Sequence, residues 1–201
     1  MQVVEINDLH DELLLPWLDL YETAFPPNER VLVSFLLKVL KDKALSRAQQ
    51  YQLRAALEPH TTLVGMAMYE LFPSCHAALL WCLAITPNER SRGQGGKLYE
   101  EILRQAKPTN TAMLLEVEIP EEAQSNQERQ LAQRRIEFYR RQGARVLRGV
   151  HYMQYVGQHQ PPLPMHVMVH PFQPMNGQTA FDVARAVFGD RITQVGALIL
   201  E

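Results

Sequence analysis

A glycine-rich stretch near the middle of the chain has the residue types of an anion-binding loop. Residues 90–96 read Arg-Ser-Arg-Gly-Gln-Gly-Gly; an apolar run precedes them at 79–85, and residues 98–106 carry apolar side chains at helical spacing. Glycines allow a ligand to approach the backbone closely, and the first N–H groups of a helix have no partner within that helix. A strand, a glycine loop and a helix in this order therefore predict a phosphate site. Its candidate residues are Arg90, Ser91, Arg92, Gly93, Gln94, Gly95 and Gly96.

Two nucleotide-binding motifs are excluded by the spacing of the glycines. A P-loop requires Ser or Thr after its lysine, whereas Gly96-Lys97 is followed by Leu98, and Ser91 stands where the upstream glycine belongs. The dinucleotide fingerprint requires its third glycine at position 98, which is leucine. A nucleotide-phosphate binder is therefore a weak alternative. The plainest alternative is a glycine turn that only ends a strand, but the two arginines and the flanking elements favour a phosphate ligand.

A second group of chemically capable residues is the pair Glu116 and Glu118. Both lie in an apolar segment, 112–119, in which they alternate with leucine and valine, so a strand there places both carboxylates on one face. Carboxylates on a central strand are costly unless they are hydrated, paired or used in chemistry. One could hold an ammonium group while the other, with a raised pKa, accepts its proton through water. The alternative is a salt bridge to Arg134 or Arg135.

The loop resembles the pyrophosphate-binding loop of the GNAT superfamily of N-acyltransferases, whose pattern is Gln/Arg-x-x-Gly-x-Gly/Ala. The matching residues are Arg90, Gly93 and Gly95. The resemblance extends over about residues 3–172, and it implies acetyl-CoA as the acyl donor. In that family the pantetheine pairs with backbone groups of the preceding strand, which here implies Leu83 and Ile85.

Two further segments are similar to the same superfamily. Residues 136–144 resemble the family's Phe-Tyr-x-x-x-Gly-Phe segment, which implies that Tyr139 protonates the departing CoA thiolate; a phenol with a pKa near 10 is suited to that step. Leu-Glu-Val at 115–117 resembles the segment that supplies the base in enzymes that acetylate protein N-termini, so Glu116, or Glu118 through water, is implied as the base. The stretch between Glu116 and Tyr139 is longer than in those enzymes, so the acceptor stays open.

The resemblance implies a mixed α/β GNAT fold, with a central sheet of about seven strands, splayed at the strand of the phosphate loop and flanked by helices. The sequence indicates one domain, 1–201, with a core at about 3–172 and a C-terminal extension at 173–201. Periodicity, breakers and caps predict strands at 2–6, 52–57, 61–71, 79–85, 112–119, 145–156 and 163–172, and helices at 12–25, 31–45, 98–106, 124–142 and 179–188.

The helix–helix corner at 21–30 has two open interpretations. Its aromatic and charged residues could line an entrance for the acceptor, or Phe25 could only fill the core while Arg30 stays on the surface. Gly65, inside a strand-like run, indicates a bulge or a close backbone approach.

Composition narrows the function class further. A net charge of −2 over 201 residues argues against a nucleic-acid binder, and no apolar run reaches the ~20 residues of a membrane span. The N-terminus lacks the pattern of a signal peptide, and Cys75 and Cys82 lack CxxC spacing, which together predict a cytoplasmic protein. His166 and His170 lie in a strand-like segment, so no metal is predicted.

The sequence therefore predicts an acetyl-CoA-dependent N-acetyltransferase that acts on a small-molecule or peptide amine, by direct attack within a ternary complex. Neither a nucleic acid nor a membrane is expected as a partner, and a homodimer is left open. The alternative from another class is a non-catalytic acyl-CoA sensor or interaction module.

Overall fold

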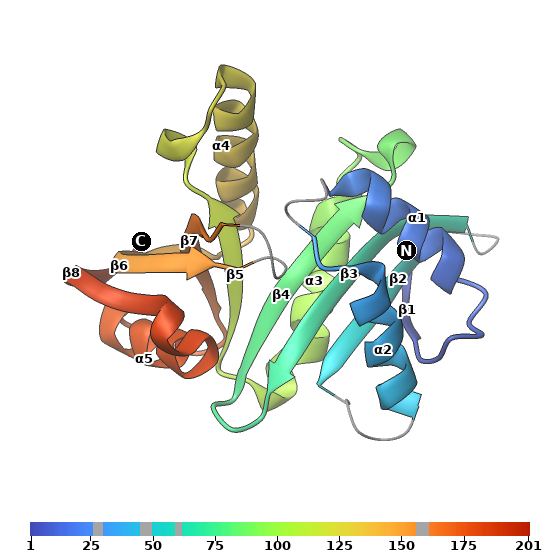
Figure 1. The fold of residues 1–201 in the computed structure, drawn as a ribbon, viewed down its shortest axis with the longest axis horizontal. Helices are drawn as coiled ribbons and strands as arrows, with labels where there is room; N and C mark the ends of the chain where they lie inside the picture. The colour runs from blue at the N-terminus through green and yellow to red at the C-terminus, as the bar shows by residue number, and fades with distance from the viewer. Residues whose placement is uncertain (26–29, 45–49, 59–61, 156–160) are drawn as a thin grey trace. The chain divides into compact units, whose positions relative to one another are not determined.

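The strands of the chain follow one another across the sheet in an order that differs from the order in sequence. The computed structural model describes residues 1–201 except 26–29, 45–49, 59–61 and 156–160. Among the described residues, eight strands lie in the order β1-β2-β3-β4-β5-β7-β6-β8 (Figure 1). Contacts divide the chain into two compact units, which consist mainly of Met1–Leu71 with Leu80–Gln105, and of Phe72–Leu79 with 106–155 and 161–201.

The first unit carries the N-terminal strands and three helices. Its elements are β1 (Gln2–Ile6), α1 (Leu14–Ala24), α2 (Val33–Ala44), β2 (Tyr51–Glu58), β3 (Thr62–Phe72), most of β4 (Ala77–Ile85) and α3 (Gln94–Ala106). β1 pairs with β2 and β2 with β3, both antiparallel. Residues 26–29, part of the helix–helix corner at 21–30, lie outside the described residues, as do residues 59–61 between the predicted strands 52–57 and 61–71.

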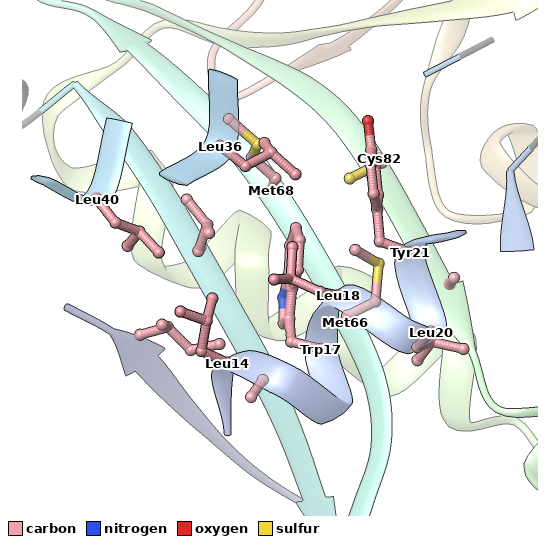
Figure 2. Packing of buried hydrophobic residues seen from close by; sticks show 14 of the residues in the cluster. Leu14, Trp17, Leu18, Leu20, Tyr21, Leu36, Leu40, Met66, Met68 and Cys82 are labelled. Atoms are coloured by element: carbon pink, nitrogen blue, oxygen red, sulfur yellow. The ribbon is translucent and has the colours of Figure 1, made fainter. Parts of the chain in front are cut away.

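Apolar residues of α1 and α2 form the core of the first unit against the strands. Trp17 is fully buried, and its indole N–H donates to the carbonyl of Arg54 at 3.0 Å, so the polar end of the ring is satisfied inside the core. Figure 2 shows these side chains pointing from the two helices onto β2, β3 and β4. Phe25 is partly buried against the same cluster, as the structural interpretation of the corner at 21–30 expects. Arg30 does not lie on the surface as that interpretation expects, because its side chain is only 20% exposed and pairs with Glu22 at 3.3 Å.

Gly65 on β3 marks both features that the sequence indicated. The register between β2 and β3 shifts at Ala56 and Leu57, opposite Gly65, which is the sign of a bulge. A Cβ at Gly65 would lie 2.6 Å from Ile85 Cδ1 and 3.2 Å from Leu98 Cδ2. β3, the end of β4 and α3 are therefore packed too closely here for a side chain.

The second unit contains β5 (Ala112–Glu118), η3 (Pro120–Glu122), α4 (Asn126–Arg141), β6 (Arg145–Gln154), β7 (Leu163–Pro171), α5 (Gly177–Phe188), η4 (Gly189–Arg191) and β8 (Ile192–Leu200). β7 pairs antiparallel with both β5 and β6, and β6 pairs antiparallel with β8. α4 begins at Ser125, whose hydroxyl accepts from the N–H of Glu128 at 3.2 Å.

The sheet has one strand more than the sequence indicated. The predicted terminal helix is present as α5, but β8 follows it and pairs with β6. β8 reads ITQVGALIL, without regular alternation and with Gly196 at its centre, so periodicity gives a weak signal. Two glycines lie against its backbone: a Cβ at Gly149 would be 2.1 Å from the carbonyl oxygen of Ala197, and one at Gly177 would be 2.2 Å from that of Leu198.

The predicted mixed α/β fold is confirmed, and most element boundaries agree within two or three residues. In the described part of the chain, no helix combines the length and the apolar character that a membrane span requires.

Candidate active site

The glycine loop joins β4 to α3 in a strained conformation. Ser91 has φ 63° and Gly93 has φ 77°, both in the left-handed region. Glycine adopts this region freely, but serine does so at a cost, and non-glycine residues held there are concentrated at ligand sites. The two left-handed residues turn the chain sharply between the strand and the helix.

The open end of α3 presents backbone N–H groups. α3 begins at Gln94, and the N–H of Lys97 donates to the carbonyl of Gly93 at 3.2 Å. The N–H groups before Lys97 stand at the positive end of the helix, where an anion is stabilised. The Gln94 side chain is nearly buried and donates to Glu58 at 3.0 Å, while Gly95 and Gly96 add no side chain.

Both arginines of the loop contact residues that lie just before the loop in sequence. Arg90 Nε donates to the carbonyl of Ile85 at 3.0 Å, so the loop is closed onto the end of β4. Arg92 pairs with Glu89 at 3.2 Å in an exposed position. The Ile85 carbonyl thus has a partner within the chain, whereas the side chain of Leu83 is partly exposed.

Glu116 and Glu118 lie on β5 in the second unit, opposite Val167 and Met165 of β7, and both are partly buried. Strand alternation puts both on one face, as predicted. Their contacts differ: the hydroxyl of Tyr152 donates to Glu116, whereas Glu118 forms an ion pair with Arg135.

The environment of Glu116 favours protonation of the carboxylate. Burial raises its pKa, and the hydrogen bond from Tyr152, the charge of Arg191 and a hydrogen bond from Gln154 oppose that rise. Burial, followed by the negative charge of Glu116, raises the pKa of Tyr152, so the phenol stays a hydrogen-bond donor. A carboxyl group with a raised pKa is suited to proton transfer near neutral pH.

Glu118 has the salt bridge that the sequence offered as an alternative. Its side chain is 31% exposed and that of Arg135 is 41% exposed. The second oxygen of Glu118 is buried and has no hydrogen-bond partner among the described residues.

Tyr139 lies in the last turn of α4, and its side chain is 9% exposed. It is buried on the same helix as Ala132 and Ile136, and its ring meets Phe138 edge-on at 5.0 Å. The backbone carbonyl of Tyr139 accepts from the N–H of Ala144 at 3.0 Å, which fixes the end of the helix.

A pocket of about 340 Å³ opens in the second unit, lined by η3, α4, β6 and β7 with both acidic and basic residues. Glu116, Glu118 and Tyr139 are not among its lining residues. Within the described ranges, no group of three or more His, Cys, Asp or Glu residues could hold a metal ion.

Comparison with known proteins decides the family. The model of the acetyltransferase (GNAT) family matches residues 14–144, more than half of the chain. The chain belongs to the GNAT family. It is therefore an acetyltransferase by family, and GNAT acetyltransferases use acetyl-CoA as the donor.

Solved structures of other GNAT proteins share this fold. A protein assigned to the family from Bacteroides thetaiotaomicron is 21% identical with a TM-score of 0.74, over 94% of this chain and 99% of that one. The ribosomal-protein-S18-alanine N-acetyltransferase of Escherichia coli is 14% identical with a TM-score of 0.57, over 87% of this chain and 96% of that one. An aminoglycoside 6'-N-acetyltransferase complexed with coenzyme A is 14% identical with a TM-score of 0.59, over 87% of this chain and 99% of that one. A search of curated protein sequences gave no match.

The loop, the carboxylate pair and the tyrosine of α4 were candidates from the sequence, whereas the residues that surround Glu116 were not. Alternation along β6 would have placed Tyr152 and Gln154 on one face. Arg191 lies just after α5, and no motif or periodicity in the sequence connects it with Glu116.

Proposed function

We propose that this GNAT protein transfers the acetyl group of acetyl-CoA to a primary amine by direct attack in a ternary complex. The observation that carries the proposal is the loop: Ser91 and Gly93 are left-handed, and α3 opens on Gln94, Gly95 and Gly96. An anionic pyrophosphate is the ligand that such a helix end is suited to bind.

The donor is bound by backbone in this proposal. N–H groups from Arg92 to Gly96 hold the pyrophosphate, and backbone groups of Leu83 and Ile85 hold the pantetheine. The carbonyl of Ile85 already accepts a hydrogen bond from Arg90. Ile85 would therefore bind the pantetheine through its backbone N–H group, or its carbonyl would bind only after the bond to Arg90 opens.

Glu116 is the proposed base. The amine nitrogen attacks the thioester carbon, the carbon–sulfur bond breaks, and the proton of the amine passes to Glu116 directly or through water. Burial, which raises the pKa of Glu116, supports this assignment over Glu118, whose charge is compensated by Arg135. Glu118, acting through water, is the less favoured base.

Tyr139 is the proposed proton donor for the CoA thiolate. A phenol remains protonated at neutral pH, and protonation of the leaving group prevents the thiolate from attacking the amide product. Its place near the end of α4, in the segment that resembles the family's tyrosine motif, supports the assignment.

The acceptor class is a small-molecule or peptide amine. Two of the fold relatives are named for their acceptors, an alanine of ribosomal protein S18 and an aminoglycoside, and both acceptors are amines. The free thiols of Cys75 and Cys82 support a cytoplasmic protein, and the net charge of −2 supports the absence of a nucleic-acid partner.

Substitution Gly95→Glu tests the donor site. It adds bulk and negative charge where the backbone would meet pyrophosphate, so we expect at least a ~100-fold loss of CoA affinity by titration calorimetry. Gly196→Glu is the matched control, because Gly196 lies on the exposed strand β8 and a Cβ there would approach Gly149 only to 3.7 Å. Unchanged CoA affinity in a folded Gly95→Glu protein would remove the proposed donor site.

A further inference from the structure

The polar contacts of Glu116 come from the part of the chain that follows the matched family region. Tyr152 donates its hydroxyl to Glu116, Gln154 adds a side-chain hydrogen bond, and the guanidinium of Arg191 acts on the carboxylate through its charge. All three residues follow position 144, where the family match ends. The surroundings of the proposed base are thus built by β6 and by the C-terminal segment.

One aromatic residue, Phe188 at the end of α5, supports both Tyr152 and Arg191. The rings of Phe188 and Tyr152 are 4.4 Å apart between centroids, and both side chains are almost completely buried. Arg191 Nε donates to the carbonyl of Phe188 at 3.2 Å, and its guanidinium lies 5.5 Å from the Phe188 ring centroid. The helix end therefore fixes a hydrogen-bond donor and a cation relative to each other.

We propose that Tyr152 and Arg191 are positioning residues: supported by Phe188, they orient the carboxylate of Glu116 and keep it able to accept a proton. The inference rests on the proposed role of Glu116 as the base. It assigns to β6 and to the segment 188–191 a part in the reaction that the glycine loop and the motif around Tyr139 do not reveal.

The physical reason is the competition between burial and stabilisation of charge. A buried carboxyl group prefers the neutral form, in which it cannot accept a proton from an ammonium group. A donated hydrogen bond and a nearby cation both favour the charged form. Without them the pKa of Glu116 would rise further, and the base would be protonated over a wider pH range.

The other groups around Glu116 supply little compensating charge. Among the residues that the structure describes, those that act on its carboxylate are Tyr152 and Gln154 from β6 and Arg191 from η4, and Glu118 lies on the same face of its own strand. Glu118 is paired with Arg135, and the residues of β7 opposite the two glutamates are Met165 and Val167, which are uncharged. Tyr152 and Arg191 therefore carry the effect.

The test measures the ionisation of Glu116 directly, by carbon-13 NMR titration of glutamate side-chain carboxyls, with the Glu116 signal assigned by its loss in Glu116→Gln. Tyr152→Phe keeps the ring against Phe188 but removes the hydroxyl, and Arg191→Gln removes the cation. Both variants should raise the pKa of Glu116 above its wild-type value. The matched controls are Tyr155→Phe, at a tyrosine that is 58% exposed, and Arg134→Gln, at an exposed arginine of α4. Both controls should titrate as the wild type does.

A kinetic measurement completes the test. In Tyr152→Phe, the acidic limb of the kcat/KM profile should move to higher pH, with about a tenfold loss on that side, the lower end for a hydrogen bond to a charged group. A residue of only structural importance would lower the melting temperature without moving that limb.

The inference is overturned if Glu116 titrates at its wild-type pH in both variants. If Tyr152→Phe does not fold, the pKa of Glu116 in Arg191→Gln alone decides whether the inference stands. Because the NMR titration needs no turnover, a protein that transfers no acetyl group but shows both pKa changes would contradict the proposed function and leave the support of Glu116 standing.

Discussion

At the scale of single residues, Glu116 and Glu118 are two positions apart on one strand and yet have different chemical surroundings. Glu116 accepts from a buried phenol, whereas Glu118 is neutralised by Arg135. We expect Glu116→Gln to lower turnover by roughly 10²–10⁴, the usual contribution of a general base, and to abolish the acidic limb of the kcat/KM profile. Steady-state kinetics over pH measures both effects.

The control for this prediction is Glu118→Gln, which should retain most of the turnover and the shape of the profile. Wild-type turnover and pH dependence in both single variants would exclude both residues as the base. The amine would then bind already deprotonated.

Tyr139 gives a second prediction at this scale. Tyr139→Phe keeps the ring on the buried side of α4 and deletes only the proposed proton donor, so CoA affinity and melting temperature should stay close to wild type. Turnover should fall about 100-fold, the lower value for general acid catalysis, because the proton is needed only as the carbon–sulfur bond breaks. A Phe variant with an unchanged kcat would leave water as the proton source.

The candidate residues that the sequence predicts lie close together in the chain, whereas the residues that surround Glu116 are brought together only by the tertiary structure. The spacing of Arg90, Gly93 and Gly95 is visible in seven consecutive letters. The contact of Glu116 with Tyr152 depends on β7 lying between their two strands, and no local pattern encodes that order. The position of the Arg191 charge depends on how the chain leaves the end of α5, which no local pattern encodes either.

At the scale of elements, the packing of β3 against β4 and α3 gives a stability prediction. Gly65→Ala would bring a methyl group 2.6 Å from Ile85 Cδ1 and 3.0 Å from the carbonyl oxygen of Ala84. Overpacking of this kind costs about 1–3 kcal/mol, and each kcal/mol lowers the melting temperature of a domain of this size by roughly 2–4 °C. Thermal unfolding followed by circular dichroism measures the change.

Two further variants sharpen the Gly65 prediction. Ile85→Val removes the nearest atom, so the double variant Gly65→Ala with Ile85→Val should be less destabilised than the sum of the two single changes. Gly196→Ala, where the new methyl group would make only an ordinary contact at 3.7 Å with the Cα of Gly149, should leave the melting temperature nearly unchanged. An additive double variant would show that the contact with Ile85 is not the cause.

Most elements were predictable because their patterns are local and regular. α4 has a serine cap and buried residues at helical spacing, and β4 is a continuous apolar run. β8 was not predictable, because an edge strand that is largely exposed needs no hydrophobic alternation and is defined by its pairing with β6.

At the scale of the whole molecule, buried titratable groups set how stability depends on pH. Burial, followed by the charge of Arg148, lowers the pKa of His166; burial, followed by Arg145, lowers that of His170. The unfolded chain binds more protons at these histidines, so their contribution is complete above the ordinary pKa of 6.5 and is lost as pH falls through the lowered values.

Glu116 changes the stability in the opposite direction with pH. Its raised pKa makes the folded state bind more protons, so its contribution is complete below the ordinary value of 4.5 and is lost as pH rises through the raised value. The melting temperature of Glu116→Gln should therefore rise relative to that of the wild type as pH rises above 4.5. His166→Gln should gain relative to the wild type as pH falls below 6.5. Melting curves measured across this range would contradict the prediction if the three proteins stayed parallel.

The close contacts of Gly149 and Gly177 with β8 have a consequence for the evolution of the chain. Each glycine has a carbonyl oxygen of β8 close to where a side chain would begin, so selection at these two positions acts through packing against the strand, and at Gly149 also through its left-handed backbone, with φ 80°. In related sequences the two glycines and the strand should be inherited together. A lineage that loses β8 would be free to accept alanine or larger residues at position 177, whereas the left-handed backbone at position 149, with φ 80°, would still favour glycine.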